Sequence, residues 1–164
     1  MELRQHCLTV FCQSDPALKV AALRALDRHG PHAIDCHTHF AHPDQPGRPN
    51  LPELVHPQQV PRRSPFTAEG HCALMHSIAH IEFNAINLAL DAVWRFADMP
   101  RAYYLDWLGV AQEEAKHFDL LRTHLRTEGH DYGDFVAHDG LWTMCEATRL
   151  DVVARMALVP RTLE

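Results

Sequence analysis

The chain has 164 residues, 46% of them hydrophobic, and a formal net charge of −6. A chain of this length can bury a single hydrophobic core without disulfides or structural metals. The negative charge provides no basic surplus to attract a nucleic-acid backbone or an anionic membrane surface. No stretch reaches the roughly 20 apolar residues of a membrane span, and the N-terminus lacks a signal-peptide pattern. We therefore expect a cytoplasmic globular protein without a membrane partner and with no indication of a nucleic-acid partner.

The cysteines are five in number, widely scattered, and never form a C-x-x-C pair. An odd, scattered set predicts neither a disulfide framework nor a structural zinc site, and is typical of reduced thiols in a cytoplasm. Cys72 and Cys145 lie in predicted helices, where we expect them to be small core residues rather than nucleophiles.

The N-terminal part, residues 1–66, predicts a short helix followed by an arm. Apolar residues recur at helical spacing from Pro16 onwards, with Ser14 or Asp15 as the N-cap, and this helix is expected to end near Gly30. Residues 31–65 contain most of the prolines, which remove backbone donors and exclude a regular helix. We expect an extended arm packed on the remainder of the protein.

Two long helices are predicted after the arm. Thr67 resembles an N-cap for a helix over 68–97, which Pro100 closes. A second helix is predicted over 101–128, and Gly129 stops it. The short connection between the two helices implies antiparallel packing.

A third long helix is predicted over 140–164, with a kink at Pro160. Residues 67–164 would then form an all-α, ferritin-like antiparallel bundle of three long helices. Such a bundle is incomplete, because a four-helix bundle needs one more helix.

Glu82 is the first candidate metal ligand, because it projects from the apolar face of its helix. On an ideal helix each residue turns by about 100°, so the neighbours of a residue can be found by counting. The neighbours of Glu82 on this count are Met75, Ile78, Ala85, Ile86, Ala89 and Val93. A buried carboxylate needs a partner that neutralises it. The same count places His76 and His80 on the opposite face.

Glu114 and His117 are the candidates on the next helix. Glu114 lies roughly 50° from the centre of the apolar stripe, whereas Glu113 points outwards. His117 follows Glu114 at i+3, so both side chains can reach one ion. An inward Glu on one helix and Glu-x-x-His on the next is half of the dimetal arrangement found in four-helix bundles. The alternative is structural: Glu82 forms a buried ion pair with an arginine or with His117.

A competing motif is the D-x-H-x-H segment at Asp35, His37 and His39, which resembles the first metal-binding strand of amidohydrolase barrels. Such a barrel needs about 250 residues and alternating strands and helices. The long helical segments after Thr67 do not fit this pattern, so a polar loop is the favoured interpretation of His37 and His39.

Several segments, in order, resemble bacterial ferritin-like proteins of the domain-of-unknown-function 455 family. They cover most of the chain and are residues 61–64, 79–91, 107–108, 113–118, 132–134, 138–142 and 155–161. This resemblance implies a bundle distantly similar to rubrerythrins and to the non-haem di-iron hydroxylase that modifies tRNA. No function is assigned to the family itself.

Carried over by position, the resemblance implies that Glu82, Glu114, His117 and Glu164 are metal ligands. Family members continue into a fourth helix with a second Glu-x-x-His, which is not found before Glu164. The expected cofactor is iron as a di-iron centre, with manganese or zinc as alternatives. The expected function is that of an oxidoreductase or hydroxylase of unknown substrate. The alternative is a metal-free helical module that self-associates, and in both cases a homodimer is expected.

Overall fold

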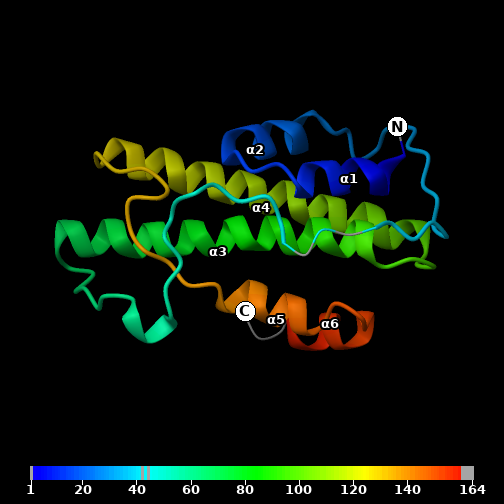
Figure 1. The fold of residues 1–164 in the computed structure, drawn as a ribbon. Coiled ribbons are helices and arrows are strands. Elements are labelled where there is room, and N and C mark those ends of the chain that lie inside the picture. The colour runs from blue at the N-terminus through cyan, green and yellow to red at the C-terminus, as the bar shows by residue number, and fades with distance from the viewer. Residues whose placement is uncertain (1, 42, 44, 160–164) are drawn as a thin grey trace. The chain divides into compact units, whose positions relative to one another are not determined.

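The computed structural model describes residues 2–41, 43 and 45–159 (Figure 1). Within these residues the structure is helical, with two isolated β-bridges and no strand. The helices are α1 (Leu3–Phe11), α2 (Pro16–Ala25), the 3₁₀ turn η1 (Pro57–Gln59), α3 (Ala68–Arg95), α4 (Arg101–Thr127), α5 (Gly140–Ala147) and α6 (Val152–Leu158). The all-α prediction is confirmed. No helix of the described chain is long and apolar enough to cross a membrane.

The chain folds as two compact units that share the long helices α3 and α4. Unit 1 comprises Met1–Pro49 and Ala85–Lys116, and unit 2 comprises Asn50–Asn84 and His117–Glu164. Each long helix is continuous, so it begins in one unit and ends in the other. The predicted division at residue 66 describes a change in the chain's composition, whereas the compact units combine segments distant in sequence.

Helix α2 of unit 1 begins as predicted. The Asp15 carboxylate accepts hydrogen bonds from the backbone N–H groups of Ala17 (2.8 Å) and Leu18 (3.1 Å), so Asp15 is the N-cap. The helix ends at Ala25, somewhat before the predicted Gly30.

Helix α1 was not predicted. It has nine residues, a length at which packing rather than intrinsic propensity decides whether a helix forms. Its apolar side chains Leu3, Cys7 and Phe11 are almost completely buried.

Two fully buried cations hold the arm of unit 1 in place. Arg4 donates to the C-terminal carbonyls of α3, at Val93 (3.3 Å) and Trp94 (2.9 Å). Its Nη1 also donates to the arm carbonyls of Asp35 (2.6 Å) and Thr38 (2.8 Å). One guanidinium therefore caps α3 and binds the arm.

Lys19 repeats this role further along the arm. Its Nζ donates to the carbonyls of Phe11 (3.2 Å) and Gly47 (3.0 Å), and to Oδ1 of Asn87. Burial, together with the charge of Arg48, lowers the pKa of Lys19 to about 7. The predicted extended arm is thus present, and buried polar contacts attach it to the helices.

In unit 2, α3 and α4 run antiparallel. The rings of Phe83 and Phe118 lie 5.4 Å apart, and those of His71 and His124 lie 6.0 Å apart, so residue numbers rise along α3 as they fall along α4. Thr67 is the N-cap of α3 as predicted, because its Oγ1 accepts from the Gly70 N–H at 3.1 Å. Gly129, with φ of 81°, ends α4 as predicted.

The prediction of one long helix after Gly140 is wrong. The chain leaves the helix after Ala147 and begins α6 at Val152. Asp151 caps α6 by accepting from Val153 (2.8 Å) and Ala154 (3.0 Å). The buried Arg155 returns to the end of α5 and donates to the Cys145 carbonyl at 2.6 Å. These contacts satisfy both helix ends, so no glycine or proline is needed at the break. The predicted kink at Pro160 lies outside the described residues.

Candidate metal centre

Helices α3 and α4 bring three predicted ligands together. Glu82 and His117 belong to unit 2, and Glu114 precedes His117 by one turn on the continuous helix α4. One donor atom from each of the three lies within 4.8 Å of the other two. Nδ1 of His117 and Oε2 of Glu82 lie 3.8 Å apart. Glu82 and Glu114 are 32 positions apart in the chain, yet one carboxylate oxygen of each lies within 4.8 Å of the other.

The three side chains line a partly open position rather than a sealed core. The Glu82 side chain is 20% exposed and the His117 side chain 48% exposed. Glu114 is half-buried, whereas Glu113 is exposed and pairs with Lys116 at 3.7 Å. The predicted distinction between Glu114 and Glu113 is confirmed. The predicted burial of Glu82 is confirmed only in part.

The donor set suits a transition metal. Carboxylate oxygens and imidazole nitrogens bind iron, manganese or zinc at about 2.0–2.2 Å, which places neighbouring donors about 3–4 Å apart. Donor atoms that lie 4.8 Å apart or less can therefore all reach one ion after small side-chain rotations. Three protein ligands leave positions open for water or substrate. Glu164, the fourth predicted ligand, lies outside the described residues, and metal ligation stays a prediction for the other three.

An ion pair is the structural alternative for the same residues. At 3.8 Å, Nδ1 of His117 and Oε2 of Glu82 are too far apart for a hydrogen bond but close enough to attract when the imidazole is protonated. Because both side chains are partly exposed, such a pair would contribute little to stability.

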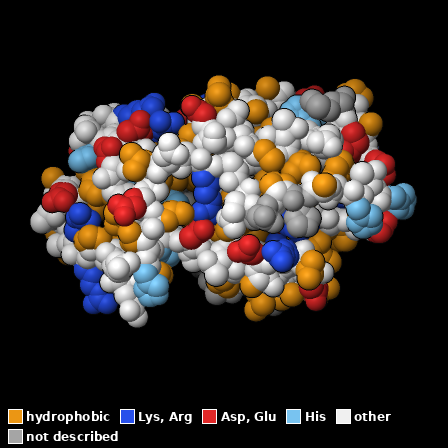
Figure 2. All heavy atoms as spheres, viewed as in Figure 1, with side chains coloured by type: hydrophobic (Ala, Val, Ile, Leu, Met, Phe, Trp, Pro, Cys, Tyr) orange, Lys and Arg blue, Asp and Glu red, His pale blue; other side chains and the backbone are white. Residues whose placement is uncertain are grey.

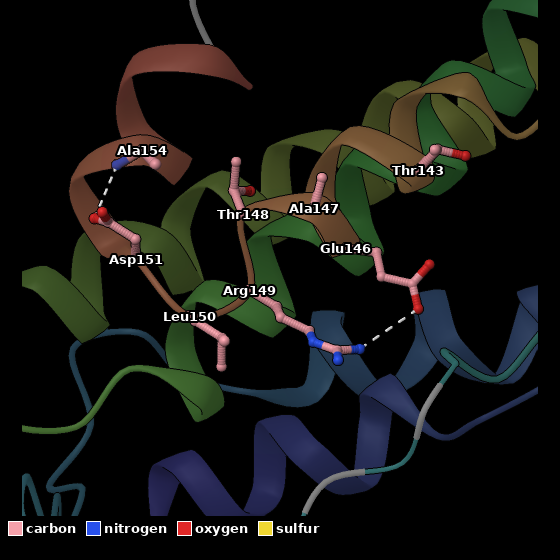
Figure 3. A pocket seen from close by; sticks show the side chains of 8 residues that line it. All are labelled: Thr143, Glu146, Ala147, Thr148, Arg149, Leu150, Asp151 and Ala154. Atoms are coloured by element: carbon pink, nitrogen blue, oxygen red, sulfur yellow. Dashed lines mark hydrogen bonds and ion pairs between the residues drawn. The ribbon is translucent and has the colours of Figure 1, made fainter.

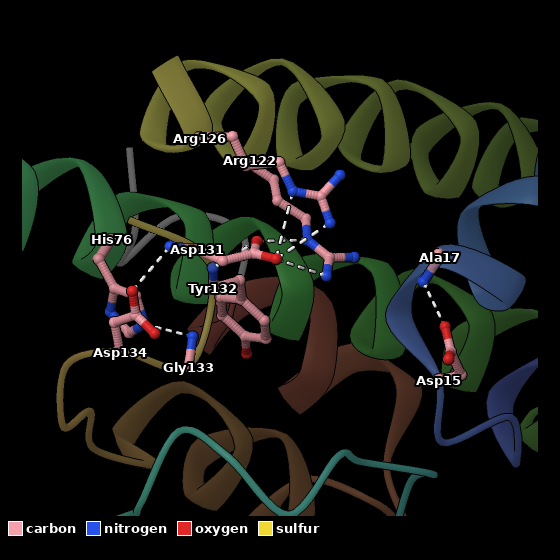
Figure 4. Close-up of polar contacts among 9 residues, drawn as sticks. All are labelled: Asp15, Ala17, His76, Arg122, Arg126, Asp131, Tyr132, Gly133 and Asp134. Atoms are coloured by element: carbon pink, nitrogen blue, oxygen red, sulfur yellow. Dashed lines mark hydrogen bonds and ion pairs between the residues drawn. The ribbon is translucent and has the colours of Figure 1, made fainter. Parts of the chain in front are cut away.

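His76 and His80 lie on the face of α3 opposite Glu82, and both are buried, which counting around the helix did not indicate. His76 accepts a hydrogen bond at Nε2 from the Gly133 N–H (2.9 Å) and stacks on the Tyr132 ring at 5.4 Å (Figure 4). Nδ1 of His80 lies 2.9 Å from the Tyr132 hydroxyl, and Nε2 lies 3.0 Å from Nδ2 of Asn84. Burial lowers the pKa of His76 to about 4, so its ring is neutral in the folded protein.

The loop after α4 covers this second face of α3. Asp131 accepts hydrogen bonds from Arg122 (2.7 Å) and Arg126 (3.0 Å), which anchor the loop to α4 (Figure 4). Burial acts to raise the pKa of Asp131, but the two arginines outweigh it and hold the pKa well below its ordinary range. The order Arg-x-x-x-Arg followed by Asp131 and Tyr132 is the sequence signal that could have indicated this cover.

The amidohydrolase-like interpretation is wrong. His37 and His39 lie on the exposed arm, where His37 Nδ1 is 2.6 Å from Oδ1 of Asp98. Within the described residues there is no strand from which a barrel could form. Cys72 and Cys145 are buried free thiols, as expected.

A pocket of about 540 Å³ opens at the break between α5 and α6 (Figure 3). Its charged side chains serve the fold: Arg149 lies 3.8 Å from Glu146, and Asp151 caps α6. The face of the molecule in Figure 2 has acidic and basic side chains interspersed, so the described residues form no single-sign patch there. Neither feature provides a better site than the Glu82, Glu114 and His117 cluster.

Fold and cluster together define an all-helical protein with a carboxylate and imidazole cluster between two antiparallel helices. Residues 12–164 match the family model described as "Protein of unknown function (DUF455)", and the chain belongs to this family. An uncharacterized protein of Haemophilus influenzae is 55% identical over an alignment of 123 residues, which covers 71% of this chain and 43% of that protein. The chain thus spans less than half the length of this relative. No solved structure matches the chain.

Proposed function

We propose that this protein binds a transition-metal ion through Glu82, Glu114 and His117 and belongs among the ferritin-like oxidoreductases. The observation that carries the proposal is that the three donor groups lie within 4.8 Å of one another. One helix provides a carboxylate and its antiparallel neighbour provides Glu-x-x-His, which is the half-site pattern of dimetal bundles.

The expected metal is iron, with manganese and zinc as alternatives, because affinity order alone does not select among them. Bound iron would activate dioxygen or peroxide. The Glu82 and Glu114 carboxylates would offset the charge of the cation. His117 would bind as a neutral imidazole, so protons compete with the metal for these ligands. The partial exposure of His117 leaves a route for small molecules to the ion.

The test is a titration of the purified protein with Fe²⁺ under anaerobic conditions, and separately with Mn²⁺, followed by calorimetry. Glu114→Ala is the test variant. Glu113→Ala is its matched control, because it removes the same chemical group one position away on the exposed side of α4. We expect Glu114→Ala to lose binding and Glu113→Ala to retain it. Equal binding by the two variants would overturn the proposal.

A metal-independent module that associates with a second copy is the second candidate. It is favoured by exposed apolar side chains around α6, where Leu150 is 89% exposed and Val153 73% exposed. Sedimentation at micromolar concentration tests it. A dimer that Leu150→Glu converts to a monomer supports this candidate, and a strictly monomeric wild-type protein contradicts it.

A further inference from the structure

Gly109 lies in the middle of α4, where glycine destabilises a helix by roughly 1 kcal/mol relative to alanine. The structure shows why a side chain is absent there. A Cβ on Gly109 would lie 2.3 Å from Nη1 and 2.6 Å from Cζ of Arg28. The guanidinium of Arg28 therefore rests directly on the helix backbone, in the space a side chain would take.

Neighbouring residues fix this guanidinium in place. Its Nη2 donates to Oδ1 of Asp106 at 2.7 Å. The preceding end of α2 is held by Gln112, whose Nε2 donates to the carbonyls of Leu23 (3.0 Å) and Leu26 (2.6 Å). Among the described residues, Asp106 alone accepts a hydrogen bond from the Arg28 guanidinium. A guanidinium has five N–H donors, so this partly exposed group can donate further hydrogen bonds to a ligand.

These residues line one pocket in unit 1. The pocket is open, has a volume of about 600 Å³, and includes Arg28, His29, Gly109 and Val110 in its lining. Glu114 lines it as well, so a residue of the proposed metal site also belongs to the pocket lining. The volume is within the range of pockets that hold small organic ligands.

We propose that this pocket binds the substrate, a small organic molecule with a single carboxylate group; this inference rests on the proposed metal-binding function. The carboxylate pairs with Arg28, whose planar guanidinium suits two-point recognition of carboxylates. The remainder of the molecule extends along Val110 towards Glu114. Asp106 and Glu113 are each paired with a cation, Arg28 at 2.7 Å and Lys116 at 3.7 Å, so they repel a single carboxylate group less than free carboxylates would. A second anionic group on the ligand would lie towards Glu114 and be repelled.

The experiment is a titration of the ¹⁵N-labelled protein with propionate, monitored by the Arg28 Nε–H and Gly109 amide signals in NMR spectra. Propionamide is the control ligand, because it has the same shape without the charge. We expect saturable shifts of both signals with propionate and little change with propionamide. Equal shifts with the two ligands, or no saturable shift with propionate, would overturn the proposal.

Matched variants show whether Arg28 is the responsible cation. Arg28→Gln should abolish the response of Gly109, whereas Arg24→Gln, the same charge change on α2 outside the pocket lining, should preserve it. Gly109→Ala should displace the guanidinium and weaken propionate binding while the helix stays folded. Full retention of binding by Arg28→Gln contradicts the assignment.

Adding Mn²⁺ separates this inference from the proposed function. Bound Mn²⁺ should broaden the resonances of bound propionate, because Glu114 belongs to both sites. Propionate binding without broadening, in protein shown by calorimetry to hold Mn²⁺, would overturn the substrate role. Failure of Mn²⁺ to bind would reject the metal site, and the metal-free titration would still report on the pocket.

Discussion

In unit 2, ionisable side chains are buried on one face of α3 and partly exposed on the other. On one face, His76 and His80 are buried against Tyr132 beneath the loop that Asp131 anchors. On the other face, Glu82 is partly exposed and meets His117 of α4.

The difference between these faces follows from charge. A neutral imidazole can be buried at a lower cost than a charged group, and Nε2 of His76 accepts a hydrogen bond although its Nδ1 has no partner among the described residues. A carboxylate stays charged and needs water, a counter-ion or a metal. The His76 face should therefore contribute to stability. The Glu82 face should contribute little to stability and serve binding.

Truncation of His76 should have the largest effect on stability. His76→Ala removes a buried ring that stacks on Tyr132 and leaves the Gly133 N–H without its acceptor. We expect the free energy of unfolding to fall by about 4 kcal/mol, which is typical of large-to-small changes in a core. Urea unfolding followed by circular dichroism measures it. A loss below about 1 kcal/mol would mean that this face is not the stabilising one.

A lower pH should reduce the free energy of unfolding through His76, by a smaller amount than His76→Ala does. The pKa of His76 is about 4 in the folded protein against 6.5 for the free group, so the unfolded chain binds more protons between these pH values. Stability from the neutral ring is therefore fully present above pH 6.5 and is lost as the pH falls towards 4. The loss is at most about 3 kcal/mol, from 1.36 kcal/mol per pKa unit.

The matched control for this pH dependence is His76→Phe, which retains an aromatic ring that cannot titrate. Urea midpoints at pH 7 and pH 5 should differ more for the wild-type protein than for His76→Phe. An identical pH dependence in both proteins would show that other groups account for it.

Loss of Glu82 should affect metal binding instead. Glu82→Ala removes a proposed direct ligand. Removing a residue that only hydrogen-bonds to a ligand already lowers metal affinity by about 10–100-fold, so losing a direct ligand should lower it at least as much. We expect Glu82→Ala to reduce Mn²⁺ affinity by about 100-fold or more in calorimetry. His76→Phe, on the opposite face, should bind Mn²⁺ with unchanged affinity. Similar affinities for Glu82→Ala and wild type would exclude Glu82 as a ligand.

The smallest expected effect is that of Glu82→Gln on the metal-free protein. The side chain is 20% exposed, and its ion pair with His117 is long. We expect the free energy of unfolding to change by less than about 1 kcal/mol. A loss comparable to that of His76→Ala would instead identify the Glu82 and His117 pair as a structural element.

Much of the helical framework was predictable because its signals are local. Asp15, Thr67 and Gly129 mark helix ends through hydrogen bonds or backbone angles within a few residues. The spacing of Glu114 and His117 likewise placed both on one side of α4. The separation of Glu114 from Glu113 followed from the same counting.

Predictions failed where distant segments decide the outcome. Counting placed His76 and His80 on the face of α3 opposite Glu82, but it did not reveal that the loop at Tyr132 covers that face. The break between α5 and α6 depends on Arg155 satisfying the end of α5, a contact that composition does not reveal. The partial exposure of Glu82 could not be predicted by counting apolar neighbours.

The sequence by itself determined the helical class, the ends of the long helices α3 and α4, and the pairing of Glu114 with His117, because each depends on interactions between residues close in the chain. Tertiary structure alone decided which polar side chains are buried, how Arg4 and Lys19 hold the arm, and that Glu82 reaches the Glu114 and His117 pair. It also placed Arg28 on Gly109. Burial and long-range contacts depend on which segments pack together, and that is set by the whole fold rather than by local sequence.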